Sequence, residues 1–337
     1  MSTLRAGIIG YGYTGQLHLQ AYQRNGIKVA AIAETRSEAL SNHPAEARHF
    51  QDYRDLLQSD IDVVSICLPT SLHSQVAVES LAAKKHVLIE KPIATTVHDA
   101  DRMIDAARRA NKLLFVGMTH RFYPEILQAK RIVDDGGIGE VVMVRDSILE
   151  HFGFLNSPAW YLQPEFAGGG TVLTSGIHLV DRVTWFLKEL PNSVSGYAQN
   201  VLLGRGVEDT AQMSLGFPSG RCAQIIFGLL PEPHPLICDL ELIGTRGSIV
   251  VHTWKGYELR CGGRSEYHET YGSEPHPHKV LNGISKEVEE FCAAIQEGRN
   301  PSPSVEESTQ ALRVIQAFYK ACKSGTIEHP EYRTGKT

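Results

Sequence analysis

The sequence predicts an α/β protein with two domains. Residues 1–121 are expected to form a doubly wound parallel sheet, and residues 122–337 an α+β domain with a mostly antiparallel sheet. Two observations predict this. Apolar runs typical of strands alternate with helical segments in the first part of the chain, as in a parallel sheet covered by helices. In the second part, strand-like runs follow one another without crossover helices, so we expect antiparallel pairing.

The first domain begins with a short apolar strand, Ala6–Ile9, and a helix over 16–25 that stops at Gly26. Glycine is a usual residue just past a helix end. Lys28–Ala33 is the second strand, and Asp62–Leu68 is nearly continuous in apolar residues, as strands buried on both faces are. The alternation continues with a helix over 73–83, a strand over 86–89, a helix over 97–111 and a strand over 113–117.

The second domain is rich in short segments of strand composition. The expected strands are 140–149, 208–217, 221–229, 238–243, 248–253 and 257–260, with hairpin loops at 216–220 and 244–247. Two helices are expected to close the chain, over 284–297 and 305–323. Ser304 is a candidate cap of the last helix, with Glu307 at the spacing of a capping box.

A glycine pattern separates the first strand from the first helix. It comprises Gly10, Tyr11, Gly12, Tyr13, Thr14 and Gly15. Gly10 permits the tight turn, Gly12 removes a side chain that would block a phosphate, and Gly15 lets the helix approach the strand. The helix N-terminus offers free N–H groups and a partial positive charge to an anion. In this strand–helix context the six residues predict a dinucleotide site.

The second strand ends in Glu34, 19 residues after Gly15. A dinucleotide fold places a carboxylate there on the adenosine ribose. Because a carboxylate repels a 2′-phosphate, the expected cofactor is NAD, with NADP as the alternative. Arg36, which follows Thr35, leaves that choice open, since its guanidinium can stack on adenine, meet a 2′-phosphate or remain solvated.

Further polar residues follow the later strands of the first domain. Ligands bind such sheets at the carboxyl ends of the strands. We therefore expect cofactor contacts from Leu68, Pro69, Thr70, His73, Glu90 and Lys91. Proline after Lys91 stiffens its backbone, and a lysine at this edge suits a proton donor or acceptor, or an electrostatic clamp on a substrate oxygen. The alternative is a surface ion pair between Glu90 and Lys91.

Several segments together resemble the Gfo/Idh/MocA family of oxidoreductases, named for glucose–fructose oxidoreductase and inositol dehydrogenase. They are the glycine turn and residues 62–70, 85–94, 117–122, 168–181, 243–248 and 287–291. The resemblance covers nearly the whole chain. It implies an N-terminal Rossmann domain and a second domain with a large open sheet that often forms the subunit interface, hence a homodimer or homotetramer.

The same resemblance implies an activity. It is that of an NAD(P)-dependent dehydrogenase or reductase that moves hydride between nicotinamide and a hydroxyl or carbonyl carbon of a sugar, sugar acid or cyclitol. It also implies that His178 reaches the substrate hydroxyl beside Lys91. The best-known sugar dehydrogenases of the family carry an aspartate four residues before this histidine, where this chain has Thr174. Threonine cannot hold a negative charge, so the proton path would run through Lys91, water or Asp181.

Four more residues are candidate substrate contacts: His120, Arg121, Trp160 and Tyr161. Arg121 suits a carboxylate or a polyol, or else forms a salt bridge at the domain seam. The two aromatic residues either stack on a sugar face or pack in the domain core.

Composition limits the partners. The net charge is −5 without a basic stripe, which argues against nucleic acid. Six scattered cysteines suit reduced thiols in the cytoplasm, and the N-terminus has no secretory pattern. No apolar run approaches the ~20 residues that span a bilayer. No metal site is expected, because Glu150-His151 lacks further ligands and 275–278 is expected to be a loop.

Two alternative functions stay open at this point. Some proteins of this fold use NAD transiently, oxidising a sugar to allow elimination, so an NAD-recycling glycosidase or lyase is one alternative. A non-catalytic, nucleotide-sensing regulator is the other.

Overall fold

The computed structural model describes residues 4–40, 43–151, 159–204, 206–230 and 235–333. The chain divides into two compact units, Met1–Thr119 with Val280–Thr309, and His120–Lys279 with Gln310–Thr337. The sequence placed residues 280–309 in the second domain, whereas the structure groups them with the first unit. The reason is packing: the ring of Phe291 stacks on that of Phe115, with the two centroids 5.8 Å apart.

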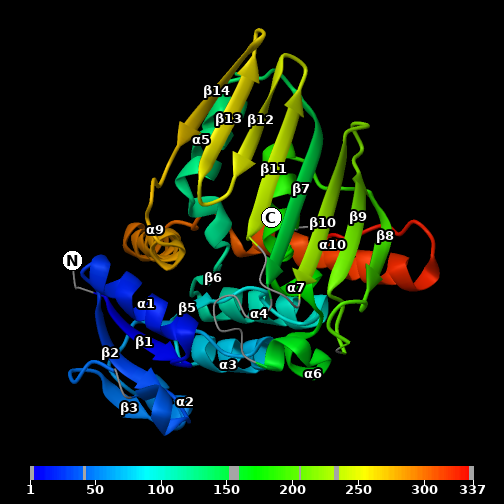
Figure 1. The fold of residues 1–337 in the computed structure, drawn as a ribbon. Helices are drawn as coiled ribbons and strands as arrows, with labels where there is room; N and C mark the ends of the chain where they lie inside the picture. Colours follow the sequence, from blue (N-terminus) through cyan, green and yellow to red (C-terminus); the bar gives the residue numbers. More distant parts are fainter. Residues whose placement is uncertain (1–3, 41–42, 152–158, 205, 231–234, 334–337) are drawn as a thin grey trace. The chain divides into compact units, whose positions relative to one another are not determined.

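Unit 1 contains a six-stranded parallel sheet in the order β3-β2-β1-β4-β5-β6. Its strands are β1 (Arg5–Ile9), β2 (Lys28–Ala33), β3 (Arg48–Phe50), β4 (Val63–Ile66), β5 (His86–Ile89) and β6 (Leu114–Val116). Its helices are α1 (Tyr13–Arg24), α2 (Tyr53–Leu57), α3 (Thr70–Ala82), α4 (Val97–Ala110) and most of α9 (His276–Glu297) (Figure 1). The predicted doubly wound sheet is confirmed.

The strand order places β1 at the centre, and the chain runs outward from it in both directions. The crevice beyond the carboxyl ends of β1 and β4 is therefore the topological switch point, where sheets of this kind bind ligands. The glycine turn follows β1 directly, so this topology places it at that crevice.

Unit 2 contains an eight-stranded sheet in the order β14-β13-β12-β11-β7-β10-β9-β8. Its strands are β7 (Val141–His151), β8 (Ser193–Gln199), β9 (Thr210–Gly216), β10 (Cys222–Leu230), β11 (Ile237–Gly244), β12 (Gly247–His252), β13 (Gly256–Cys261) and β14 (Arg264–Glu269). All neighbours pair antiparallel except β7 and β10, which are parallel. The expectation of a mostly antiparallel sheet is confirmed.

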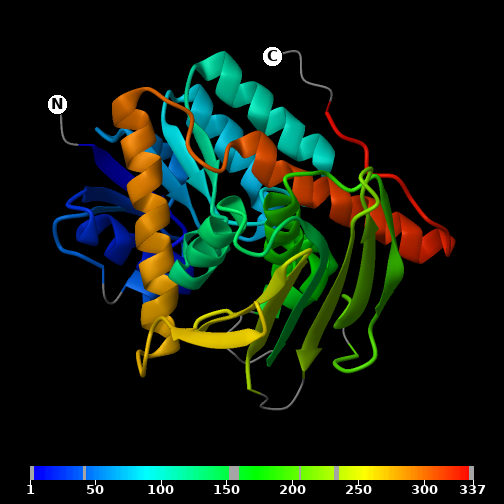
Figure 2. The ribbon, with the colours of Figure 1, turned by 90° about the horizontal axis from the view of Figure 1, so that it is seen from above.

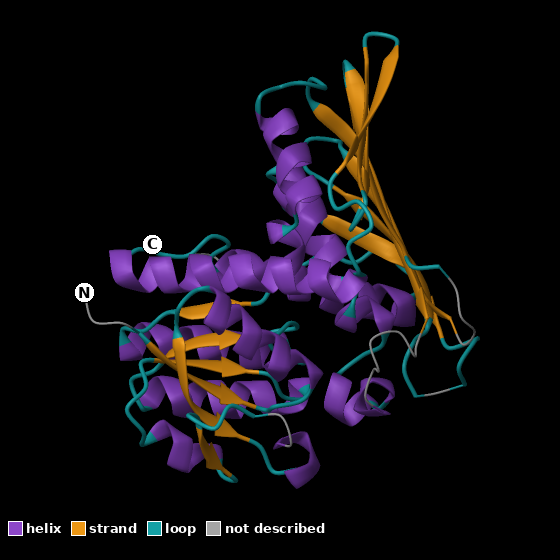
Figure 3. Cartoon of the chain, turned by 60° about the vertical axis from the view of Figure 1, so that its left-hand side comes forward, coloured by secondary structure: helices purple, strands orange, loops and turns teal. Residues whose placement is uncertain are grey.

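Helices of unit 2 lie against one face of this sheet, which Figure 3 shows edge-on. They are α5 (Pro124–Asp134), α7 (Thr171–Thr174), α8 (Ile177–Leu187) and the larger part of α10 (Val305–Ser324), while the short α6 (Pro164–Ala167) contacts the 3-10 turn at 159–162. Burial alternates along strands of this sheet such as β9, where every second residue is buried. That alternation is what a sheet with one covered and one open face requires.

Several details differ from the sequence-based expectations, including β3 and β8, which were not predicted, and one agrees closely. Residues 275–278 were expected to form a loop, but α9 begins at His276 and runs as one long helix (Figure 2). Pro277 does not prevent this, because proline is tolerated in the first turn of a helix. Strand β14 was not predicted, since all its residues are exposed and give no apolar alternation. The capping box of α10 is confirmed: Ser304 Oγ accepts from Glu307 N at 3.2 Å, and Glu307 Oε2 accepts from Ser304 N at 2.8 Å.

Candidate cofactor and catalytic site

The glycine turn of unit 1 has the geometry that the sequence predicts. Gly10 has a φ of +88°, and a Cβ there would lie 2.4 Å from the carbonyl oxygen of Cys67. A Cβ on Gly15 would lie 2.1 Å from the carbonyl oxygen of Gly10. The N-cap of α1 is Gly12, which has no side chain to cap the helix, and the first turn holds no acidic residue. The N-terminal amides of α1 thus remain suited to an anion, and this turn fits the pyrophosphate of a dinucleotide.

Glu34 lies beside this turn at the end of β2. Its Oε2 accepts from the backbone N–H of Tyr11 at 2.9 Å, and Arg36 donates from Nε to Oε1 at 3.1 Å and from Nη2 to Oε2 at 3.0 Å. Burial raises the pKa of Glu34, but the hydrogen bonds from Arg36 and Tyr11 outweigh it and lower that pKa to about 2. A fixed carboxylate at this place fits a ribose diol, since it accepts from hydroxyl groups.

The expected cofactor residues differ in exposure. Tyr13, Thr35 and Arg36 are exposed, while the side chains of Tyr11 and Thr70 are buried. Thr14, Leu68 and Pro69 are half-buried. Residues of this group line the carboxyl edge of the sheet in unit 1, as predicted.

His73 holds two loops of that edge together. Its ring is buried, with Nδ1 2.9 Å from the carbonyl oxygen of Pro92 and Nε2 2.9 Å from that of Leu68. Both ring nitrogens face main-chain carbonyls, so His73 braces the loop that carries Lys91 against the end of β4. His73 therefore acts at this edge by fixing the backbone of Leu68 and Pro92.

Glu90 and Lys91 follow β5 and are both half-buried. Glu90 is not a surface residue paired only with its neighbour, because its Oε1 lies 2.9 Å from Nε2 of the fully buried His18. The sequence analysis did not single out His18. A signal existed: Ser65, a polar residue inside the apolar strand β4, needs a buried hydrogen-bond partner, and His18 Nδ1 supplies it at 3.0 Å.

In unit 2, His120 and His178 form a stacked pair. Their ring centroids are 4.0 Å apart and the rings are inclined by only 3°. Both side chains are buried, and His120 also meets the edge of Trp254 with centroids 5.5 Å apart. The two expected substrate residues are therefore brought together, although 58 positions separate them in the sequence.

Arg121 forms a buried ion pair with Asp181. Its Nε donates to Oδ2 at 2.7 Å and its Nη2 to Oδ1 at 2.8 Å, and its guanidinium carbon lies 5.0 Å from the ring centre of Trp185. This is the salt-bridge interpretation that the sequence left open, with both partners inside unit 2. Both carboxylate oxygens of Asp181 are accordingly engaged by the guanidinium of Arg121.

Thr174 is the last residue of α7 and is buried. Its Oγ1 donates to the carbonyl oxygen of Gly170 at 2.8 Å, a bond to its own helix turn. Trp160 and Tyr161 lie in a short 3-10 turn, half-buried, with ring centroids 4.2 Å apart. Their partial exposure leaves them accessible, unlike aromatic residues of a closed core.

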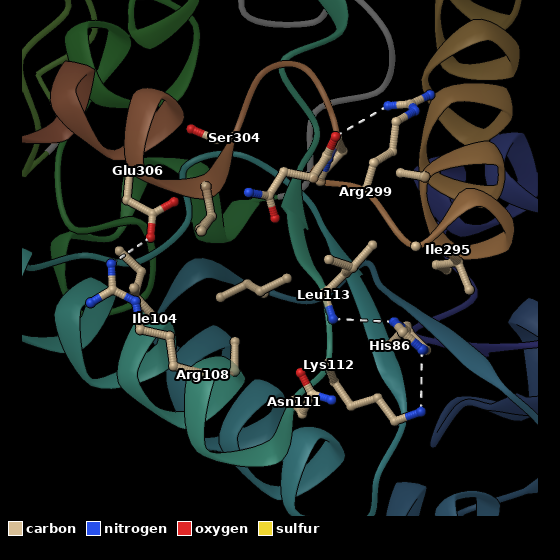
Figure 4. Close-up of a pocket in the computed structure, with 17 residues that line it drawn as sticks. His86, Ile104, Arg108, Asn111, Lys112, Leu113, Ile295, Arg299, Ser304 and Glu306 are labelled. Atoms are coloured by element: carbon tan, nitrogen blue, oxygen red, sulfur yellow. Dashed lines mark hydrogen bonds and ion pairs between the residues drawn. The ribbon is translucent and has the colours of Figure 1, made fainter. Parts of the chain in front are cut away.

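A pocket of about 660 Å³ lies at the opposite edge of the sheet in unit 1 (Figure 4). It is lined by the start of β5 and β6, by α4, by the end of α9 and by residues 298–306. Inside it, His86 Nδ1 accepts from Leu113 N at 3.1 Å and Arg108 Nη2 donates to Glu306 Oε1 at 2.8 Å. None of the expected site residues lines it.

Two searches of the described residues gave no site of another kind. No group of three or more His, Cys, Asp or Glu side chains there is placed to hold a metal ion. Within the same part of the chain, no helix combines the length and apolar character needed to cross a bilayer.

Comparisons with known proteins agree with the geometry. Residues 4–118 match the model of an oxidoreductase family with an NAD-binding Rossmann fold, GFO_IDH_MocA, and residues 126–250 match the C-terminal domain model of the same family. The chain is 26% identical to levoglucosan dehydrogenase of Pseudarthrobacter phenanthrenivorans over 387 aligned positions, covering 98% of this chain and 99% of that protein. It is 33% identical to inositol 2-dehydrogenase of Salmonella typhimurium over 203 positions, covering 58% of each.

Solved structures show the same fold. A levoglucosan dehydrogenase in complex with NADH and levoglucosan superposes with a TM-score of 0.86 at 24% identity, covering 98% of this chain and 100% of that one. An aldose–aldose oxidoreductase from Caulobacter crescentus, complexed with glycerol, gives a TM-score of 0.85 at 24% identity, over 97% and 100%. With both domains matched by models of one family, the chain belongs to the Gfo/Idh/MocA family of oxidoreductases with an NAD-binding Rossmann fold.

Proposed function

We propose that this chain is a dehydrogenase or reductase of a polyhydroxylated small molecule, namely a sugar, a sugar acid or a cyclitol. The observation that carries the proposal is the joint presence of the glycine turn with Glu34 and of Lys91 at the same edge of one parallel sheet. Relatives named levoglucosan dehydrogenase and inositol 2-dehydrogenase support this substrate class. Bound NAD would supply the hydride acceptor, and NADH the donor.

The residues proposed to hold the cofactor fall into three groups. Residues 10–15 would receive the pyrophosphate at the N-terminus of α1. Glu34 would accept from the ribose hydroxyls, with Arg36 fixing its carboxylate. The rest of the cofactor would be bordered by Leu68, Pro69, Thr70 and the loop at Glu90. His73 braces two of these segments against each other. Because Glu34 is held ionised, a 2′-phosphate would meet a fixed negative charge, which favours NAD over NADP.

Lys91 and His178 are the proposed acid–base residues. A lysine ammonium can donate to a substrate oxygen and stabilise the negative charge that develops there when hydride leaves the adjacent carbon. An imidazole can hold or release the hydroxyl proton near neutral pH. Stacking on His120 fixes the ring plane of His178, so we propose His120 as its positioning partner in unit 2. Trp160 and Tyr161 are the proposed aromatic contacts of a sugar face.

We further propose that two copies of the chain associate through the open face of the sheet in unit 2. On that face Tyr197 is 73% exposed, Ile226 is 50% exposed and Met143 is 42% exposed. The register places Tyr197 and Ile226 on either side of Gln212. Exposed apolar side chains gathered on one sheet face are typical of an interaction surface.

The test of the proposed reaction is turnover with Lys91→Met beside a matched control, Lys28→Met. Lys28 is an exposed lysine of the same unit, outside the site. With NAD and a panel that includes myo-inositol and levoglucosan, we expect NADH formation by the wild-type chain and the control. Loss of general acid–base help lowers turnover by roughly 10²–10⁴-fold, so Lys91→Met should lose activity at this scale while still binding NADH.

Three outcomes would contradict the proposal in different ways. Full activity of Lys91→Met removes that side chain from the chemistry. Product formation without net change in NADH absorbance indicates the NAD-recycling glycosidase or lyase. Binding of NADH without turnover of any member of the panel indicates the nucleotide-sensing regulator.

A further inference from the structure

A chain of three buried polar groups runs from α1 to the half-buried Glu90 of the loop that carries Lys91. Tyr22 Oη lies 2.9 Å from Ser65 Oγ, Ser65 Oγ lies 3.0 Å from His18 Nδ1, and His18 Nε2 lies 2.9 Å from Glu90 Oε1. The side chains of Tyr22, Ser65 and His18 are fully buried. Water therefore does not compete for these contacts, and the donors and acceptors must match one another.

One direction of donation satisfies every contact. If Glu90 is a carboxylate, it accepts from His18 Nε2–H, which leaves Nδ1 to accept from the Ser65 hydroxyl, whose oxygen accepts from Tyr22 O–H. In the reverse direction Glu90 must be protonated, and the Tyr22 hydrogen then needs a new acceptor. Burial raises the pKa of Tyr22 well above its ordinary value, so this phenol remains a donor. The chain consequently ends on an ionised Glu90.

A second carboxyl group, that of Glu287, is buried in the same unit. It belongs to α9, and its Oε2 accepts from Thr119 Oγ1 at 3.0 Å. Its Oε1 has no hydrogen-bond partner among the described residues, and it would lie 3.2 Å from a Cβ on Gly117, the residue after β6. Because Gly117 N donates to the carbonyl oxygen of Ile89 at 2.8 Å, this carboxyl group lies beside the end of β5, where Glu90 follows.

The two carboxyl groups differ in ionisation. Burial tends to raise the pKa of Glu90, but the hydrogen bond from His18 and the charge of Lys91 lower it overall. Burial, and then the charge of Glu90, raise the pKa of Glu287 well above its ordinary value. Two carboxyl groups that interact in a buried site share one proton, and here the proton belongs to Glu287.

Five titratable groups surround Glu90, and they come from different elements of unit 1. They are His18 of α1, Cys67 after β4, His73 of α3, Lys91 of its own loop and Glu287 of α9. Burial raises the pKa of Cys67 well above its ordinary value, followed by the charges of Glu90 and Glu287, so the thiol is neutral. Lys91 is the cation of its loop, and its charge acts on the carboxylate of the preceding residue, Glu90.

We propose that Glu90 is a fixed counter-charge for Lys91, and that His18, Ser65, Tyr22 and Glu287 are positioning residues that keep the negative charge on Glu90 alone. The chain from Tyr22 begins on the helix that follows the glycine turn, so it also ties α1 to the Lys91 loop. This inference rests on the proposed function for its catalytic meaning. An adjacent anion stabilises an ammonium, and the chain thereby sets the charge with which Lys91 meets a substrate oxygen.

The test compares two isosteric substitutions, Glu90→Gln and Glu287→Gln, in the full-length chain. The main readout needs no turnover: competitive acetylation of lysines by acetic anhydride at a series of pH values, with the Lys91 peptide quantified by mass spectrometry. Loss of a neighbouring opposite charge shifts a titration by about 1 or more pH units. We expect the Lys91 midpoint to fall by about that much in Glu90→Gln and to stay unchanged in Glu287→Gln.

Tyr22→Phe provides a milder variant should Glu90→Gln fail to fold, as judged by NADH binding and melting temperature. Removing the terminal donor weakens the chain without deleting Glu90, so we expect a smaller shift of the Lys91 midpoint in the same direction. Identical Lys91 midpoints in the wild type, Glu90→Gln and Tyr22→Phe would overturn the inference, as would an equal shift in Glu287→Gln. Absence of turnover with any sugar would count against the proposed function alone, because the acetylation readout does not depend on it.

Discussion

The two units of this protein bury charged groups in contrasting ways. In unit 1, a chain of neutral donors ends on Glu90, the residue that precedes Lys91 at the ligand edge of the sheet. Unit 2, by contrast, contains two closed pairs of buried charges. Arg182 donates to Asp146 from Nε at 2.6 Å and also from Nη2, with both side chains wholly buried, and Arg121 holds Asp181 in the same bidentate way.

This contrast shows how burial serves two ends. In a closed Arg–Asp pair each charge is neutralised within the pair, so little capacity remains for a ligand, and removing one partner leaves a buried charge without compensation. A donor chain that ends on a carboxylate leaves a net charge beside a reactive group. We therefore expect substitutions in the Arg–Asp pairs to change the stability of the fold. Substitutions in the hydrogen-bonded series from Tyr22 to Glu90 should instead change the titration of Lys91 and the rate of turnover.

The largest effect on stability is expected for Arg182→Met. Burial raises the pKa of Asp146 to about 6 even against the charge of Arg182, so the carboxyl group depends on its partner to remain ionised. Breaking a buried pair costs about 3–5 kcal/mol, measured as the free energy of unfolding in urea. Arg145→Met is the control, because Arg145 directly precedes Asp146 in β7 but its side chain is 67% exposed.

A double variant sharpens this expectation. Replacing both partners, Arg182→Met with Asp146→Leu, removes both charges and should recover a large part of the lost stability, since apolar replacements of buried pairs are often near neutral. If the two substitutions instead lower the unfolding free energy additively, the two side chains do not act as a pair.

The next largest effect is expected for Arg121→Met, at about 2–3 kcal/mol of unfolding free energy, since this pair is buried but retains slight exposure. The measurement also separates two interpretations of Arg121. A structural ion pair predicts reduced stability with an unchanged KM in the molecules that fold. A substrate-binding arginine predicts a raised KM at nearly unchanged stability, which would remove the contrast between the units.

A smaller effect is expected for Ser304→Ala at the start of α10. Its hydroxyl caps the helix and belongs to neither charge network, so its loss should cost about 1 kcal/mol. Urea unfolding again provides the measurement. The neighbouring Ser302→Ala serves as control, since no side-chain cap is formed there among the described bonds. A loss of several kcal/mol would mean that α10 depends on its cap far more than helices usually do.

The smallest effect on stability is expected for Glu34→Gln, below about 1 kcal/mol at neutral pH, because the partner Arg36 is 56% exposed and solvent screens the pair. Its pH dependence is diagnostic. The folded-state pKa of about 2 lies below the ordinary value of 4.5, so the stability contributed by the carboxylate is present above pH 4.5 and disappears as the pH falls toward 2.

Urea unfolding of the wild type and Glu34→Gln across this pH range should give curves that converge at the acidic end. The substitution should also weaken NAD binding, since an amide replaces the acceptor of the ribose hydroxyls. A stability difference that persists unchanged to pH 2 would show that the carboxylate charge is not what Arg36 and the Tyr11 amide stabilise.

Much of the first unit was predictable because its signals are local. The glycines of residues 10–15 encode a backbone turn, the alternation of apolar strands and helices encodes a parallel sheet, and Glu34 follows at a fixed spacing. The cap at Ser304 was predicted for the same reason, since all its hydrogen bonds lie within one helical turn. The loop expected at 275–278 was wrong, because α9 begins at His276 and tolerates Pro277 in its first turn.

The buried partners were not predictable in this way. His18, Ser65 and Glu90 lie on separate elements, and only the packing of α1 against β4 and β5 brings them together. The stack of His120 on His178 and the pair of Arg121 with Asp181 likewise join residues 58 and 60 positions apart. Glu287 gave one signal, since it shares a helix face with the buried Ile284, Val288 and Phe291, where an acid is unexpected.

By itself, then, the sequence determined the class of fold, the dinucleotide turn and the family, because backbone conformation and apolar periodicity are written in neighbouring residues. Only the tertiary structure decided which polar side chains face one another in the interior, because those contacts depend on where distant elements pack. Burial then gives these contacts their chemical meaning, since without competing water each carboxyl group takes the charge that its neighbours allow.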